Sequence, residues 1–73
     1  MNTENLNLPE TQVYKSCLEL AKQGDNGIEF CFDELQVTGF STAMLKGYVS
    51  QLIQKGFIGK IEDGYFDFYI IKE

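Results

Sequence analysis

The chain has 73 residues, of which 11 are acidic and six are lysine, and it contains neither arginine nor histidine, so its formal net charge is −5. A chain this short forms one small domain, and its 44% hydrophobic content suffices for one compact core, which excludes an unfolded polar chain. The acidic balance disfavours long-range attraction to nucleic acid and to anionic membranes, and the lack of histidine excludes conventional zinc sites and imidazole catalysis.

The N-terminal stretch and the two cysteines indicate where the protein is located and whether it binds a metal. The N-terminal stretch MNTENLNLPE has neither the basic nor the apolar region of a signal peptide, and no apolar run approaches the ~18 residues of a membrane span. Cys17 and Cys31 lie in apolar surroundings without CxxC or metal-ligand spacing, so we interpret both as buried thiols. We therefore predict a cytoplasmic protein with no cofactor, no metal and no membrane contact.

The N-terminal part is predicted to contain a flexible arm over residues 1–8, followed by a single folded domain over residues 9–73. Pro9 suits the first turn of a helix, where its missing N–H costs nothing, and Glu10 lies near the positive end of the helix dipole. Apolar residues then recur at helical spacing: Val13, Cys17, Leu20 and Ala21. This spacing predicts an amphipathic helix that ends at Gly24.

A short strand and a short helix are predicted next. Residues 28–32, IEFCF, alternate and carry aromatic side chains, which is typical of a strand. Asp33 is a suitable N-cap, and Gln36, three residues later, completes a capping-box pattern. The pattern predicts a very short second helix over residues 34–38 that stops near Gly39.

The third helix has the clearest pattern in the chain. Ser41 is a suitable N-cap, and Gly56 suits the left-handed position that follows many helix ends. The apolar positions between them form one continuous face: Leu45, Tyr48, Val49, Leu52 and Ile53. We predict a helix over residues 41–55.

A β-hairpin is predicted after this helix. Asp63-Gly64 favours a two-residue type I′ turn, because both central residues of that turn need positive φ. The predicted hairpin pairs residues 58–62 with residues 65–69.

Alternation along the returning strand places Tyr65, Asp67 and Tyr69 on one face. Exposed tyrosines at these positions would suit base stacking or a protein contact. We favour the interpretation that they form cross-strand pairs that stabilise the hairpin.

The order helix, strand, short helix, helix and hairpin resembles a winged helix-turn-helix domain of the small bacterial or phage type. The segments that carry the resemblance are GIEFCFDEL, TGFSTAMLKGYVSQLIQKGFI and KIEDGYF, and it covers residues 9–71. It implies an α+β winged helix-turn-helix fold with three helices, a short strand and a C-terminal hairpin as the wing. It also implies a DNA-binding role of the transcription-regulator type, in which the third helix enters the major groove.

The candidate DNA contacts lie on the surface of the third helix opposite its apolar face, together with one lysine of the wing. The candidate nucleic-acid-binding residues are Thr42, Ala43, Lys46, Gly47, Ser50, Gln51 and Lys60. The third helix is poorer in basic residues than is usual in the family. A glycine inside a helix costs about 1 kcal/mol relative to alanine. Gly47 therefore either admits a partner at close range or is a tolerated exposed position.

The sequence is compatible with two functions. The first is a DNA-binding module that docks on duplex DNA as a homodimer. The alternative is an acidic winged-helix module that binds another protein, or inhibits one, without binding DNA. Clustering of Lys46, Lys55 and Lys60 on one face would favour DNA, whereas dispersal would favour a protein partner. An enzyme is not expected, because the chain has no nucleophile paired with a base and no Gly-rich phosphate loop.

Overall fold

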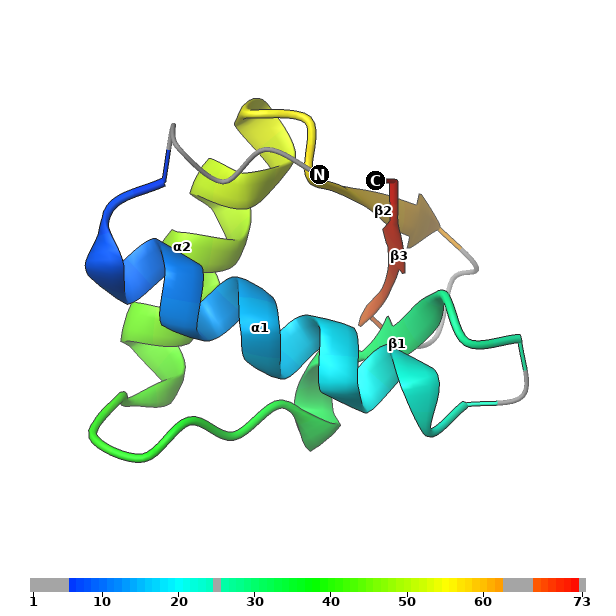
Figure 1. Cartoon of the computed structure of the whole chain (residues 1–73), viewed down its shortest axis with the longest axis horizontal. Helices are drawn as coiled ribbons and strands as arrows, with labels where there is room; N and C mark the ends of the chain where they lie inside the picture. The colour runs from blue at the N-terminus through cyan, green and yellow to red at the C-terminus, as the bar shows by residue number, and fades with distance from the viewer. Residues whose placement is uncertain (1–5, 25, 63–66, 73) are drawn as a thin grey trace.

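The computed structural model describes residues 6–24, 26–62 and 67–72, which form an α+β fold (Figure 1). Two α-helices, one 3-10 turn and three strands occur in these residues. Their order is α1 (Leu8–Lys22), β1 (Glu29–Cys31), η1 (Phe32–Glu34), α2 (Thr42–Gln54), β2 (Ile58–Glu62) and β3 (Asp67–Ile71). Neither described helix is long and apolar enough to cross a membrane.

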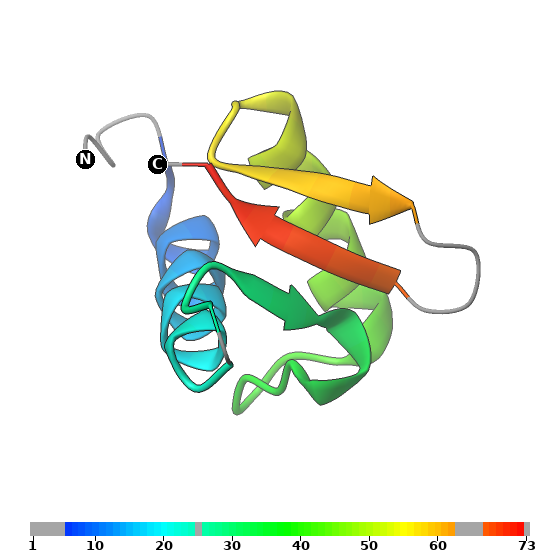
Figure 2. The same ribbon diagram turned by 90° about the vertical axis from the view of Figure 1, so that its right-hand side faces the viewer.

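The three strands form one antiparallel sheet in the order β1-β3-β2, so the last strand lies between the other two. Figure 2 shows the strands side by side with α2 behind them. Side chains of both helices and of the sheet meet in a single apolar core. The buried hydrophobic residues are Leu6, Val13, Tyr14, Cys17, Ala21, Phe30, Phe32, Leu35, Leu45, Val49, Leu52, Phe57 and Ile58.

Helix α1 begins one residue before the predicted position. Asn7 is its N-cap: the side-chain oxygen of Asn7 accepts a hydrogen bond from the Glu10 amide at 2.9 Å, and the Asn7 amide donates to Glu10 Oε1 at 2.9 Å. This is a capping box, which satisfies donors that the first turn would leave unpaired. Leu6 is buried in the core. Residues 6–8, which were predicted as part of the arm, therefore belong to the folded unit.

The predicted second helix over residues 34–38 is wrong. The chain forms only the single turn η1, and Leu35 then adopts an extended conformation with φ −75° and ψ 122°. A helix of five residues gains too few hydrogen bonds to offset the cost of nucleation. Burial of Leu35 in the core decides the conformation instead. The segment that follows turns where Phe40 N–H donates to the Val37 carbonyl at 3.0 Å.

Helix α2 confirms the third predicted helix. Ser41 Oγ accepts a hydrogen bond from the Met44 amide at 3.2 Å. At the other end Gly56 has φ +86°, its N–H donates to the Ile53 carbonyl, and the Phe57 N–H donates to the Leu52 carbonyl. This pair of bonds is a Schellman motif, which explains why glycine follows the helix.

The predicted hairpin register is wrong by two residues. Glu62 pairs with Asp67, and Ile58 pairs with Ile71, so four residues separate the strands in place of the predicted two. A shift of two preserves the faces of a strand, because side chains alternate with period two. The predicted Asp63-Gly64 turn and Tyr65 lie outside the described residues.

The register of β3 is set by both of its neighbours. Tyr69 lies opposite Phe30 of β1, and the two rings stack with centroids 5.7 Å apart. Tyr69 and Ile71 pack against the core. Tyr69 is therefore a cross-strand partner, but its aromatic pair is with β1, and its partner within the predicted hairpin is Lys60.

Candidate nucleic-acid interface

The outward face of α2 carries six of the seven candidate residues, and all six are exposed: Thr42, Ala43, Lys46, Gly47, Ser50 and Gln51. The face exists because Leu45, Val49 and Leu52 are buried on the opposite side of the helix. A Cβ atom placed on Gly47 would meet no other atom within 4 Å. Apart from Lys46, the helix therefore presents small and neutral polar side chains on this face.

A shallow depression lies on the same helix, lined by Met44, Gly47, Tyr48 and Gln51. Met44 is 44% exposed, and the Tyr48 ring meets the Phe40 ring edge-to-face with centroids 5.6 Å apart. The sequence pattern assigned Tyr48 to the buried face and did not single out Met44. The 3.6-residue period places both at the edge of the apolar face, where burial depends on the neighbouring loop.

Two of the predicted lysines lie beside one aromatic pair. The Nζ atom of Lys46 lies 5.9 Å from the centroid of the Phe32 ring, and that ring lies 6.2 Å from the ring of Tyr69 in an edge-to-face arrangement. Tyr69 is the cross-strand partner of Lys60, and directly opposed residues share a face of the sheet. Lys60 of β2 therefore lies on the face of the sheet that carries Tyr69, and Phe32 and Lys46 lie against this same face.

Lys55 does not join these two lysines. Its Nζ atom lies 2.8 Å from Glu10 Oε1, and Glu10 is only 1% exposed whereas the Lys55 side chain is 37% exposed. The hydrogen bond from Lys55 is the main cause that holds the pKa of Glu10 below its usual value. The Asn7 amide also lowers this pKa, while burial opposes both. Lys55 therefore connects α2 to α1, although its side chain remains partly exposed.

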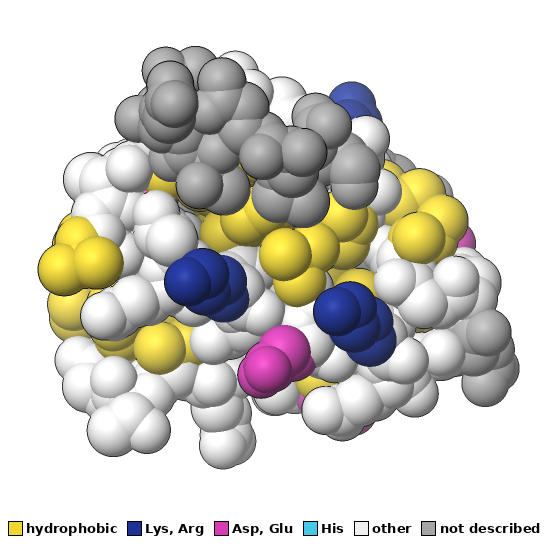
Figure 3. Space-filling model, viewed as in Figure 1, with side chains coloured by type: hydrophobic (Ala, Val, Ile, Leu, Met, Phe, Trp, Pro, Cys, Tyr) yellow, Lys and Arg dark blue, Asp and Glu magenta, His cyan; other side chains and the backbone are white. Residues whose placement is uncertain are grey.

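The exposed charges of α1 are of both signs, unlike the lysines of α2 and β2. Figure 3 shows the face of the molecule that carries α1, where basic side chains lie on either side of an acidic one. The exposed charged residues of α1 are Lys15, Glu19 and Lys22. The carboxylate between the two lysines lowers the attraction of this face for phosphate.

The two cysteines differ from each other. Cys17 is fully buried in the core, and burial raises the pKa of its thiol to about 12, so it is unreactive. Cys31 is half-buried and free, so the prediction of a buried thiol is confirmed for Cys17 alone. Among the described residues no group of three or more His, Cys, Asp or Glu side chains is arranged to hold a metal ion.

No protein-family model matches the chain, and no curated protein and no solved structure matches it. The surface of α2 and the positions of the lysines are therefore the features that bear on function.

Proposed function

We propose that the chain is a winged-helix module that binds duplex DNA and acts as a transcription-regulator-like protein. In this proposal α2 enters the major groove and the β2–β3 hairpin is the wing. The order of the elements and the strand order β1-β3-β2 support this arrangement, with η1 in the place of the second helix. The observation that carries the proposal is the exposed face of α2 with Lys46 and Lys60 beside the same aromatic pair.

The candidate residues have three kinds of role in this proposal. Lys46 and Lys60 contact phosphate, while the hydroxyl and amide groups of Thr42, Ser50 and Gln51 donate to or accept from base edges and phosphate oxygens. Ala43 and Gly47 let the helix backbone approach the groove closely.

Two phosphate contacts give weak binding. They predict a salt slope of about −1.8 on duplex DNA, since each neutralised phosphate contributes about −0.9. Two copies on adjacent half-sites would double this slope, so we propose that specific binding requires a homodimer.

The test is fluorescence anisotropy with a random-sequence duplex over a series of salt concentrations. We expect Lys46→Glu to weaken binding at low salt by about tenfold and to reduce the salt slope by about one, and Lys60→Glu to act in the same direction. Lys15→Glu is the matched control, because it makes the same charge change on the exposed face of α1.

Two results would contradict the proposal: no binding at low salt, or equal losses in Lys46→Glu and Lys15→Glu. The second result would mean that only the net charge of the chain matters.

A protein partner on the same face is the second candidate. The depression lined by Met44, Gly47, Tyr48 and Gln51 favours it, because an exposed methionine beside a tyrosine suits an apolar contact. Co-purification of a stable partner that is lost in Gly47→Arg would support this function. Unchanged association in that variant would reject the α2 face as the protein contact.

A further inference from the structure

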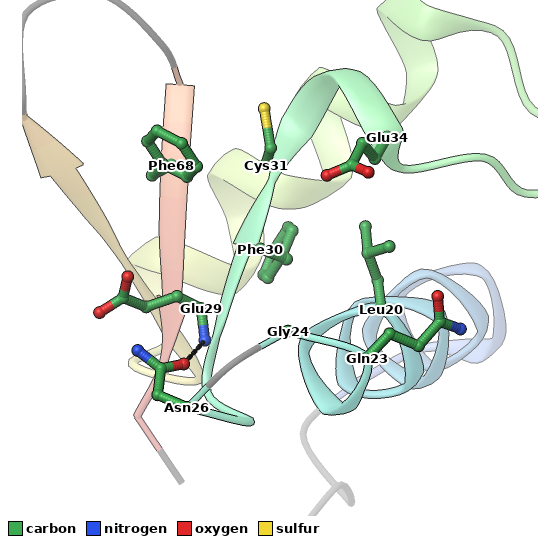
Figure 4. A pocket seen from close by; sticks show the side chains of 9 residues that line it. All are labelled: Leu20, Gln23, Gly24, Asn26, Glu29, Phe30, Cys31, Glu34 and Phe68. Atoms are coloured by element: carbon green, nitrogen blue, oxygen red, sulfur yellow. Dashed lines mark hydrogen bonds between the residues drawn. The ribbon is translucent and has the colours of Figure 1, made fainter.

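A groove with a mixed lining of apolar and acidic side chains lies on a different part of the surface, between the C-terminal half of α1 and the β1–η1 segment (Figure 4). Its volume is about 400 Å³. The apolar part of its lining comes from three elements that are far apart in the chain: Leu20 of α1, Phe30 and Cys31 of β1, and Phe68 of β3. The groove continues along α1 into a smaller hollow of about 260 Å³, with which it shares Leu20, Gln23 and Glu34.

The rim of this groove is rich in carboxylates. Glu29 and Glu34 line the groove and Glu19 lines the smaller hollow, and all three are exposed. None of the three has a salt-bridge partner within the described part of the chain. In Figure 4 the carboxylate of Glu34 points toward β1, over the groove. The rim therefore presents negative charge that is not neutralised by the described lysines.

The edge of the groove at β1 is held by local hydrogen bonds. The side-chain oxygen of Asn26 accepts from the Ile28 amide at 3.0 Å and from the Glu29 amide at 3.1 Å. Gly24 lies against the Glu29 carbonyl, because a Cβ atom there would come within 3.2 Å of that oxygen. The start of β1 is thus held in place by these hydrogen bonds.

We propose that this groove is the docking site for a basic segment of a partner protein. An apolar side chain of that segment lies on Cys31 and Phe68, which are paired across β1 and β3 and share a face of the sheet. Lysine or arginine side chains on either side of it pair with Glu29 and Glu34. Charge complementarity selects this occupant, since the same carboxylates repel nucleic acid and anionic lipid.

This site is separate from the proposed DNA contacts. It uses no residue of α2, and in Figure 4 the helix α2 lies behind β1 and β3 as seen from the groove. A partner bound here leaves the α2 face open, so the inference does not depend on DNA binding.

The test is an NMR titration of the full ¹⁵N-labelled chain with a short, acetylated and amidated peptide of alternating leucine and arginine. We expect the largest shifts at the amides of residues 20–24 and 29–34. Glu29→Gln and Glu34→Gln should each weaken binding by about threefold, and the double variant by about tenfold. Asp33→Asn is the matched control: it removes the same charge next to Glu34, on an exposed residue that does not line the groove.

Two further peptides separate the apolar part of the recognition from the charge without altering the protein. A peptide of alternating glycine and arginine should bind about tenfold more weakly. A peptide of alternating leucine and glutamate should not bind.

Three results would overturn the proposal: no shifts at millimolar leucine–arginine peptide, an equal loss in Asp33→Asn, or equal affinity for the glycine–arginine peptide. An equal loss in Asp33→Asn, or equal affinity for the glycine–arginine peptide, would mean that the basic peptide is attracted to the acidic chain in general and not to this groove. Glu34→Gln should not weaken the binding of duplex DNA, so the two proposals can fail independently.

Discussion

The two ends of α2 show how differently one residue type is used within a single helix. Near the C-terminal end, Lys55 pairs with the buried carboxylate of Glu10 at 2.8 Å. In the N-terminal half, Lys46 lies over the ring of Phe32 at 5.9 Å and remains exposed. An aromatic ring attracts an ammonium group but accepts none of its hydrogen bonds fully, so the donors stay available for a ligand. The number of lysines in a sequence therefore overstates the size of a DNA interface.

The environments of the two ends explain the contrast. Near the C-terminal end of α2, Lys55 pairs with Glu10, which also caps α1. Just beyond that end, the Phe57 ring contacts the Tyr14 ring of α1 edge-to-face at 5.1 Å. At the N-terminal end, the cap is Ser41 alone, and the residues of the first turn are exposed. The C-terminal end of α2 is therefore held by contacts with other elements, whereas the N-terminal turn is exposed.

The largest effect should come from Glu10→Ala, which removes the capping box and the ion pair together. We expect the free energy of unfolding to fall by about 2 kcal/mol, a value reduced from that of a fully buried pair because Lys55 reaches solvent. Urea denaturation measures this loss. Glu19→Ala is the control on the exposed face of the same helix and should change stability by less than about 0.5 kcal/mol. Equal losses in the two variants would show that the C-terminal end of α2 is not specially stabilised.

The same contact should make stability depend on pH. Because the pKa of Glu10 is lower in the folded chain than in the unfolded chain, its stabilisation is complete above the unfolded value and is lost as the pH falls through the folded value. The loss should be smaller than that in Glu10→Ala, since protonation keeps the side chain in place. Urea denaturation in this acidic range should show a shallower decline for Glu10→Gln than for the parent chain. Parallel curves would contradict the assignment to Glu10.

Gly56→Ala tests whether the backbone conformation at the C-terminal end of α2 contributes to stability. Gly56 has φ +86°, a conformation that costs an L-residue about 1 kcal/mol. We expect the midpoint of urea unfolding to fall accordingly, with an unchanged m-value. An unchanged midpoint would mean that the Schellman motif is not retained in solution.

Gly47→Ala makes the identical substitution in the open half of α2 and should have the opposite sign. The site has space for a methyl group and a helical environment, so we expect a gain of about 0.7 kcal/mol in the free energy of unfolding. The midpoint of urea unfolding should rise. A loss of stability would indicate that the outward face of α2 is covered in solution, for example by a second copy.

Local signals in the sequence were sufficient for α2 and for its exposed face. Ser41, Gly56 and the spacing of Leu45, Val49 and Leu52 act within a few residues of one another, so the helix and its outward side chains follow from periodicity. The predicted helix over 34–38 failed because burial of Leu35, a tertiary effect, outweighed a local capping pattern.

Features that depend on distant contacts could not be predicted in this way. The hairpin register depends on pairing between β3 and β1, such as Phe30 with Tyr69, and no local pattern near the turn contains that information. The association of Glu10 with Lys55 and the groove beside β1 also combine residues from separate elements. The groove was missed for this reason, although its acidic residues are visible in the sequence.

The contact between Glu10 and Lys55 joins residues that are 45 positions apart in the chain. Closing so long a segment costs entropy that is recovered only after α1 and α2 have docked, so the contact forms late in folding. Its loss should therefore leave the folding rate nearly unchanged and accelerate unfolding. In a chevron plot, the variants at Glu10 should raise the unfolding limb while the folding limbs superimpose. The pair thus determines how long the folded molecule persists, and contributes little to how quickly it forms.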